Sequence, residues 1–215
     1  MMLWENMRKL VLRLRIQQFL YKTAHQAYMI SKKWRGIPNF NHHETCTKCH
    51  RTESMQHILL KCQANTRKLI WRKAKEMWSH RHQTWPQISL GTIIGIGSIN
   101  IPPAEDRPQA DGNRRSLEQR GRTRLLQILI LEASHLIWVL RYERAIHGKS
   151  HSNHKIEGRW LKKINERLTN DRIITTKIKR DATHSQLIDA TWKKTLIQSN
   201  IPHQGWLQRR EVFSR

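Results

Sequence analysis

Three cysteines and one histidine lie close together with the spacing of a metal site. They are Cys46, Cys49, His57 and Cys62, in the pattern C-x2-C-x7-H-x4-C. Two thiolates separated by two residues can face one ion across a tight turn, and an imidazole with a third thiolate completes a tetrahedral Cys3His set. The chain has only these three cysteines, and an odd number in a reducing compartment argues against disulfides. The pattern predicts a Zn²⁺-binding knuckle over residues 46–62; the alternative is ordinary buried cysteines with a chance spacing.

The spacing of His57 and Cys62 also constrains the backbone. On a continuous α-helix, residues five apart point roughly 140° apart, at about 100° per residue. We therefore expect the chain to bend between them, and the next helix to begin only after Cys62. Other imidazoles compete for the fourth position; His50 lies directly beside Cys49, which makes a shared tetrahedron awkward, and it ranks below His57. These competitors are His42, His43 and His50.

Four protein ligands would leave no open position on the ion. Catalytic zinc keeps such a position for a water molecule, so the expected site is structural and the chain is not expected to be an enzyme. Basic residues surround the cysteines and are predicted to contact phosphates. They are Lys48, Arg51, Lys61, Arg67 and Lys68.

The charge of the whole chain points to a polyanionic partner. Lysine and arginine number 40 against 16 acidic residues, a formal net charge of +24. Because such a charge repels itself in a compact state, we expect nucleic acid, RNA or DNA, as the partner. A membrane surface is the second candidate, and a merely solvated basic surface is the third. A second basic cluster is either a solvated face or a phosphate-binding stripe; it comprises Arg114, Arg115, Arg120, Arg122 and Arg124.

The segments around these groups are predicted to be helices. The expected fold class is all-α, a helical domain around the zinc knuckle, with room for one short strand pair beside it. Apolar residues recur at helical spacing over 4–33, and Gly36-Ile37-Pro38 ends that helix. We expect an N-terminal amphipathic helix (1–35), the knuckle and a following helix (36–82), a linker or loop (83–113), a C-terminal helical region (114–198) and a flexible tail (199–215).

Boundaries within these regions follow from caps and periodicity. The helix after the knuckle should begin at Asn65 or Thr66, and Ser152 can cap a later one. Residues 125–140 are apolar almost all round, which predicts a central buried helix within 114–147. A last helix is expected over 186–198, whereas residues 90–101 fit either a short helix or a strand.

Polar and aromatic residues within these helices have two interpretations. Glu132 and His135 are either an acid/base or second metal site, or a buried polar pair that links helices, and their apolar surroundings favour the second. The tryptophans of the apolar faces could stack on bases, but their helical spacing favours core packing. They are Trp138, Trp160 and Trp192.

The knuckle and several later stretches resemble one known family. The knuckle resembles the reverse-transcriptase zinc-binding segment near the end of non-LTR retrotransposon polyproteins, in a version common in basidiomycete fungi. The resemblance spans roughly residues 19–192. It is carried by Thr52-Glu53-Ser54-Met55-Gln56-His57-Ile58-Leu59-Leu60-Lys61-Cys62, by Phe19-Leu20-Tyr21-Lys22-Thr23-Ala24-His25 with Ile37-Pro38, by Leu90-Gly91-Thr92-Ile93-Ile94-Gly95, by Glu132-Ala133-Ser134-His135-Leu136-Ile137-Trp138 with Arg141 and Glu143-Arg144, and by Arg159-Trp160, Ile164-Asn165, Arg167-Leu168 and Asp171-Arg172.

The resemblance implies handling of a template or of the element's RNA without catalysis. Endonuclease, reverse transcriptase and ribonuclease H are separate modules of such polyproteins, and only the zinc-binding tail is matched. The alternative is a structural module that docks on polymerase or ribonuclease H domains; a ribonuclease H-like fragment is less favoured, because the sequence lacks the necessary carboxylates. With no signal peptide and no bilayer-long apolar run, we expect no membrane partner and an intracellular location, in the nucleus rather than the cytoplasm.

Overall fold

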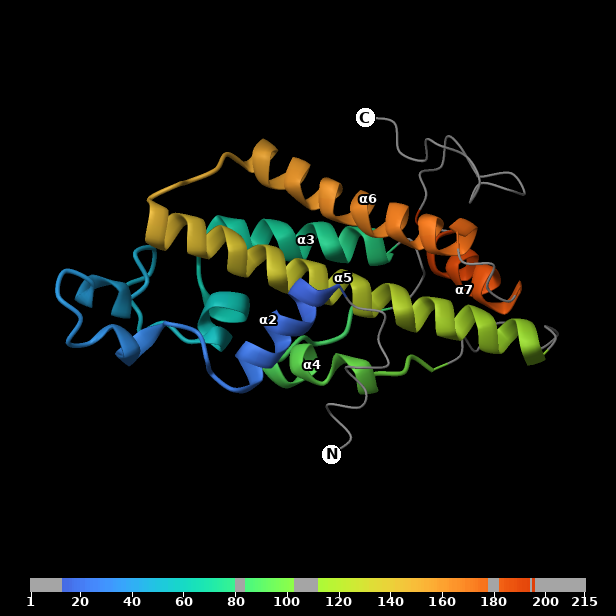
Figure 1. Cartoon of the computed structure of the whole chain (residues 1–215), viewed down its shortest axis with the longest axis horizontal. Coiled ribbons are helices and arrows are strands. Elements are labelled where there is room, and N and C mark those ends of the chain that lie inside the picture. Colours follow the sequence, from blue (N-terminus) through green and yellow to red (C-terminus); the bar gives the residue numbers. More distant parts are fainter. Residues whose placement is uncertain (1–12, 80–83, 103–111, 178–181, 194, 196–215) are drawn as a thin grey trace.

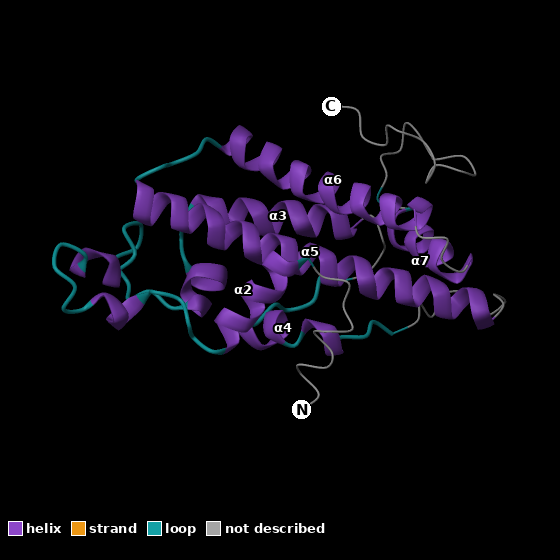
Figure 2. Ribbon diagram, in the orientation of Figure 1, coloured by secondary structure: helices purple, strands orange, loops and turns teal. Residues whose placement is uncertain are grey.

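Helices make up nearly all the regular structure of this chain. The structure is a computed structural model, and it describes residues 13–79, 84–102, 112–177, 182–193 and 195. The α-helices of the described part are α2 (Leu14–Ala24), α3 (Asn65–Ser79), α4 (Leu90–Ile94), α5 (Gly112–His147), α6 (Asn153–Lys177) and α7 (Ala182–Trp192). Figure 2 shows helices and loops but no strand among these residues, and the expected strand pair is a single antiparallel bridge between Thr45 and Thr52. The all-α prediction is confirmed.

Helix α5 is the central element, and the other α-helices pack around it. It contacts α2, α3, α4, α6 and α7, and it runs along most of the long axis of the molecule in Figure 1. Its middle turns are fully buried on every side, as the apolar run predicts: Leu125, Leu129 and Leu136 are 0% exposed. By length and composition a window within Ser116–His147 could cross a membrane, but 78% of that window is buried inside the structure. It is therefore the core of a folded domain.

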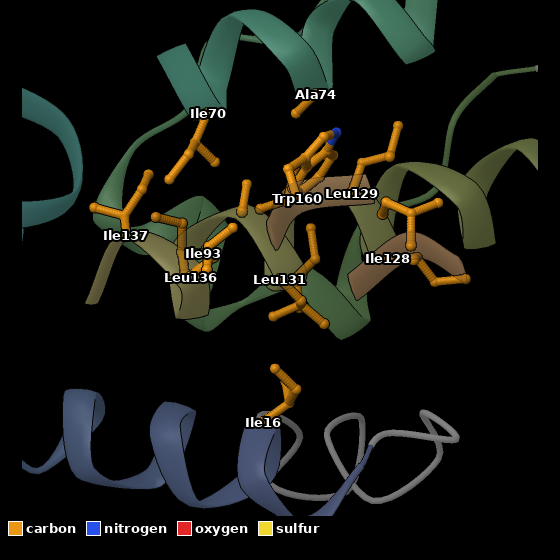
Figure 3. Packing of buried hydrophobic residues seen from close by; sticks show 14 of the residues in the cluster. Ile16, Ile70, Ala74, Ile93, Ile128, Leu129, Leu131, Leu136, Ile137 and Trp160 are labelled. Carbon is orange, nitrogen blue, oxygen red and sulfur yellow. The ribbon is translucent and has the colours of Figure 1, made fainter. Parts of the chain in front are cut away.

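Apolar side chains from five helices interlock around α5. Figure 3 shows Ile16 of α2 pointing toward Leu131 of α5, and Ala74 of α3 beside Trp160 of α6. Trp160 and Trp192 are at most 1% exposed, so the core interpretation is confirmed for these two tryptophans. Trp138 is only partly buried and lies at the edge of the core.

The first helix ends earlier than its apolar pattern predicts. α2 stops at Ala24, whereas a helix to residue 33 was expected; the part of that prediction over residues 4–12 lies outside the described residues. Gln26 adopts φ +50°, and the N–H groups of Gln26 and Ala27 donate to the carbonyls of Thr23 and Lys22. This is a Schellman ending with glutamine where glycine is usual, so the sequence carries no signal for it.

The segment predicted as a linker is in part a packed structural element. Within residues 83–113, Ser89 and Thr92 form a reciprocal capping box that starts α4. Ile93 and Ile96 are 0% exposed and belong to the core. The open choice between helix and strand is thus settled as a short α-helix followed by a 3₁₀ turn (Ile96–Ser98), and the linker prediction is wrong for these turns.

Helix α6 begins at the cap that the sequence offers, whereas α7 begins earlier than its periodicity predicts. The hydroxyl of Ser152 accepts a hydrogen bond from the N–H of Lys155, so it caps α6 as predicted. α7 begins at Ala182, four residues before the predicted start. It approaches α5 so closely that a Cβ on Gly121 would lie 2.6 Å from the backbone of Ala190. The tail over 199–215 lies outside the described residues.

Buried charges join the helices. Arg13, just before α2, donates to Glu132 of α5 at 2.6 Å and to Glu166 of α6 at 3.0 Å. His135 lies edge-on against the ring of Phe19 instead. Glu132 and His135 therefore link helices through separate partners and do not act on each other. The buried interpretation expected side chains that link helices, as found, but it also expected the two to form a pair. Asp171 accepts hydrogen bonds from Arg124 and from the indole of Trp192, each at 2.8 Å.

Candidate metal centre

The four residues singled out by their spacing converge on one point. The ligand atoms of Cys46, Cys49, His57 and Cys62 all lie within 4.8 Å of one another. The sulfurs of Cys46 and Cys62 are 3.6 Å apart, and the sulfur of Cys49 is 3.2 Å from Nε2 of His57. This group could hold a metal ion, and it is the predicted set without substitution.

A tight turn brings the first two cysteines together. The N–H of Cys46 donates to the carbonyl of Arg51, and the N–H of His50 donates back to the carbonyl of Cys46. His50 closes the turn with φ +54°. The bridge between Thr45 and Thr52 holds the base of the turn, so the two sulfurs share its inner side.

A widened helical turn brings the other two ligands together. Residues His57–Lys61 form a π-helical turn, which closes with a hydrogen bond from the N–H of Cys62 to the carbonyl of His57. An i→i+5 bond places residue 62 over residue 57, whereas an α-helix would rotate the two apart. Ser54 caps this turn by accepting from the N–H of His57. The α-helix is interrupted between the two ligands as expected, but by a π-helical turn and not by the predicted bend; α3 begins only after Cys62.

The environment of the ligands favours a bound cation. Burial lowers the pKa of His57, which keeps its imidazole neutral and able to donate a lone pair. Burial, together with the neighbouring sulfurs of Cys46 and Cys49, raises the pKa of Cys62 to about 11. The pKa of Cys49 moves the other way: burial opposes its ionisation, but hydrogen bonds from the backbone of Gln63 and Arg51 and from the neighbouring thiols lower it. For Cys62, a buried negative charge close to other thiolates is unfavourable. A positive ion among them would remove that repulsion and stabilise the thiolates.

The competing histidines do not reach this group. His43 is buried, but it packs against Trp34, Phe40 and His42, with ring centroids 4.0–5.7 Å apart. The left-handed backbone at His50 ends the cysteine turn, and its side chain is exposed. His57 belongs to the ligand group and His50 does not, as expected, and the two other competitors, His42 and His43, also lie outside that group.

A buried ion pair fastens the knuckle to the helical core. Glu53, between the bridge residue Thr52 and the cap Ser54, pairs with Arg141 of α5, and the two side chains are 3% and 4% exposed. The knuckle lies beside the C-terminal end of α5 (Figure 1). The sequence analysis does not identify this pair, because the partners are 88 residues apart and only the fold brings them together.

The basic residues predicted around the knuckle fall into two groups. Lys48, Arg51, Lys61 and Lys68 are exposed and can meet a ligand in solvent. Arg67 is half-buried, and its Nε donates to the carbonyl of Cys62. Arg67 therefore supports the backbone of a metal ligand, and it is a poorer candidate for a phosphate contact.

The second basic cluster is also divided by the fold. Arg120 on α5 is exposed, and Arg122 is partly buried. Arg124 is 16% exposed in its side chain and pairs with Asp171 inside the bundle, so its charge is used internally. The side chains of Arg114 and Arg115 lie outside the described residues. The cluster does not form one continuous exposed stripe over its described members.

Comparison with known proteins leaves the site to be interpreted from its own chemistry. No family model, no curated protein and no solved structure matches this chain.

Proposed function

We propose that this chain is a non-catalytic, zinc-binding and nucleic-acid-binding module. The observation that carries the proposal is the convergence of four ligand atoms within 4.8 Å in a strongly basic chain. The chain's own groups supply two functions: the knuckle holds a rigid loop, and exposed lysines and arginines bind phosphates.

The donor set fits zinc. Three thiolates and one imidazole match a structural Cys3His site, in which Zn–S bonds are about 2.3 Å and Zn–N bonds about 2.0 Å. Bonds of that length in a tetrahedron separate two sulfurs by roughly 3.8 Å, close to the 3.6 Å between Cys46 and Cys62. Zn²⁺ would be held by Cys46, Cys49, His57 and Cys62, and its charge would stabilise the thiolates. Four protein donors leave no position for a reacting water, which supports a structural role.

The charge supports nucleic acid as the partner. A net charge of +24 makes association with a polyanion favourable through the release of its counterions. Four of the five basic residues around the knuckle are exposed, so the metal site would hold a loop that presents positive charge. We also propose, from the resemblance of the sequence pattern, that this module is of the kind that follows the reverse transcriptase of a non-LTR retroelement, within an intracellular, nuclear setting.

Metal analysis tests the first part of the proposal. Purified chain should contain about one zinc per molecule, and His57→Ala should lower the metal affinity strongly. His50→Ala is the matched control, because His50 is the adjacent imidazole outside the ligand group. Full zinc content in His57→Ala, or none in the wild type, would overturn the assignment.

A salt series tests the second part. Affinity for an oligonucleotide should fall linearly with the logarithm of salt concentration, with a slope of about 0.7–0.9 per phosphate contact. Lys48→Gln with Arg51→Gln should reduce that slope by roughly 1.5. Lys75→Gln, an exposed lysine on α3, is the control. Binding without salt dependence would favour the alternative of a protein-docking module.

A further inference from the structure

An open aromatic pocket lies beside the knuckle, at the C-terminal end of α5. Its volume is about 500 Å³, within the range of small-molecule sites in proteins. Tyr28 and Trp34 line it from the loop after α2, and Trp138 and Tyr142 line it from α5. Four aromatic rings from segments far apart in sequence thus surround one space.

The rings are held in place by contacts with each other and with neighbouring rings. Tyr28 and Trp138 pack with centroids 4.0 Å apart, and burial raises the pKa of Tyr28 to about 12. Trp34 stacks on Phe40 with centroids 5.7 Å apart. Tyr142 remains 42% exposed, so its ring is accessible to a ligand. A planar molecule entering the pocket would meet preformed aromatic surface.

Positive charge lies at the same place. Nζ of Lys22 lies 5.9 Å from the centroid of Tyr28, and the guanidinium of Arg141 lies 5.6 Å from that of Trp138. Glu44 and Glu53 of segment 13–61, and Glu143 beside Tyr142, are each paired with an arginine. Because Glu53 offsets the charge of Arg141, the exposed Lys22 is the lining residue whose positive charge can attract an anion.

We propose that this pocket receives an unpaired base of a single-stranded nucleic acid. The proposal rests on the nucleic-acid-binding function above and names the group that the chain recognises. Bases stack on aromatic side chains irrespective of sequence, while nearby cations bind the phosphates on either side. In a duplex the bases are already stacked on each other, so the pocket selects single strands or unpaired loops.

The knuckle helps to position this pocket. Arg141 lines the pocket and pairs with Glu53, which lies between the two pairs of metal ligands in the chain. The metal-held loop thereby fixes the position of the Arg141 side chain in the pocket wall. We expect the base pocket to form fully only when the knuckle is folded.

The test compares two strands with the same number of phosphates, an oligothymidine and an abasic strand. Tyr142→Ala and Trp34→Ala should each weaken oligothymidine binding, on the order of 5- to 100-fold, as expected for loss of one stacked base. Binding of the abasic strand should not change, and neither should the salt slope. Tyr142→Phe, which keeps the ring, should restore affinity.

Tyr21→Ala is the matched control, because Tyr21 is 55% exposed on α2 but does not line the pocket. Circular dichroism and zinc content of each variant report whether it is folded. If wild-type chain binds both strands and neither Tyr142→Ala nor Trp34→Ala changes oligothymidine affinity, the pocket proposal is overturned and a protein ligand becomes the better occupant. Equal losses on both strands would also overturn it. If the wild type binds neither strand, the proposed function itself fails.

Discussion

The knuckle and the helical bundle are stabilised by different physical means. The bundle buries a continuous cluster of apolar side chains around α5, including Trp78, Trp160 and Trp192. The knuckle itself has two parts: Met55, Ile58 and Leu59 of its helical turn belong to the main core, whereas the cluster around its cysteines contains little more than the cysteines and Ala64. The cysteine turn, with so little apolar burial, cannot offset its conformational entropy, whereas metal coordination can.

A buried ion pair connects these regions, in addition to the core packing of Ile58 and Leu59 and the hydrogen bond from Trp71 to the carbonyl of Leu59. Glu53 comes from the knuckle and Arg141 from the central helix, and the pair is almost completely removed from solvent. Buried pairs contribute little compared with apolar substitutes, but losing one partner leaves a buried charge without compensation. The comparison therefore predicts that the bundle survives loss of the metal, and that the joint between the regions depends on both partners.

Removal of the metal should have the largest effect, and only on the knuckle. Structural zinc contributes roughly 10–16 kcal/mol to the folding of isolated zinc-finger peptides. Cys46→Ser should abolish zinc binding and expose the cysteine turn, residues 46–54, to rapid hydrogen exchange, while protection in α5 and α6 is kept. A common loss of protection in both regions would contradict the separation of the two.

Truncation of a central side chain should have the opposite effect: it should destabilise the bundle and leave the metal site of the knuckle unchanged. Trp160 is 1% exposed, and Trp160→Ala should lower the free energy of unfolding by about 3–5 kcal/mol because it leaves a cavity among α3, α5 and α6. Urea unfolding followed by circular dichroism measures this loss. Zinc content of the folded fraction should be unchanged, and a proportional loss of zinc would show that the two regions fold as one unit.

Removing the ion pair between Glu53 and Arg141 should affect both the knuckle and the bundle. Glu53→Gln leaves the guanidinium of Arg141 buried without a carboxylate, and should destabilise the protein by about 3 kcal/mol. Glu53→Gln combined with Arg141→Met should recover part of that loss, because the unpaired charge is then gone. A double-mutant cycle in urea measures the coupling; strictly additive losses would mean that the pair does not hold the two regions together.

Acid should weaken the bundle independently of the knuckle. Burial lowers the pKa of His135 from its ordinary value of 6.5 to about 4. Between these values the unfolded chain binds a proton that the folded chain does not, so the free energy of unfolding falls as pH decreases from 6.5 to 4, by at most about 3 kcal/mol. His135→Leu should flatten this dependence. Urea midpoints in a Cys46→Ser background exclude zinc release, and His154→Leu, at an exposed position, is the control.

Removal of a surface pair should have the smallest effect. Arg72 and Glu76 are 3.7 Å apart on α3, with side chains 64% and 51% exposed. Such i,i+4 pairs are solvated on both sides, so Arg72→Ala should change stability by no more than about 0.5 kcal/mol. Thermal unfolding of this variant gives the baseline for the larger effects, and a loss comparable with Glu53→Gln would remove the distinction between buried and exposed pairs.

Local signals made part of the fold and the metal group predictable. The C-x2-C turn, the interruption of the α-helix between His57 and Cys62, the start of α3 after Cys62 and the cap at Ser152 depend on residues within a few positions of each other. The central helix was also predictable, because a run that is apolar on all sides can only be buried. Such features depend on short-range backbone geometry and on the removal of apolar side chains from solvent. Both are visible in the spacing and periodicity of the sequence.

Long-range packing decided what the local pattern could not. α2 ends at a Schellman turn on Gln26, although no glycine marks it, and Ile93 and Ile96 pack into the core from a segment with the composition of a linker. Arg124 carries the same charge as Arg120, yet only Arg124 faces a buried carboxylate. Which charges remain free for a ligand depends on where distant acidic groups lie.

The sequence by itself determined an all-α chain, its high positive charge and the four residues of the metal group, because those properties follow from composition and from spacing along a short segment. Only the tertiary structure decided that Glu53 meets Arg141, and that Tyr28, Trp34, Trp138 and Tyr142 line one pocket. Those partners are brought together by the packing of α2 and the knuckle against the end of α5, and a contact between distant segments leaves no periodic trace in the chain.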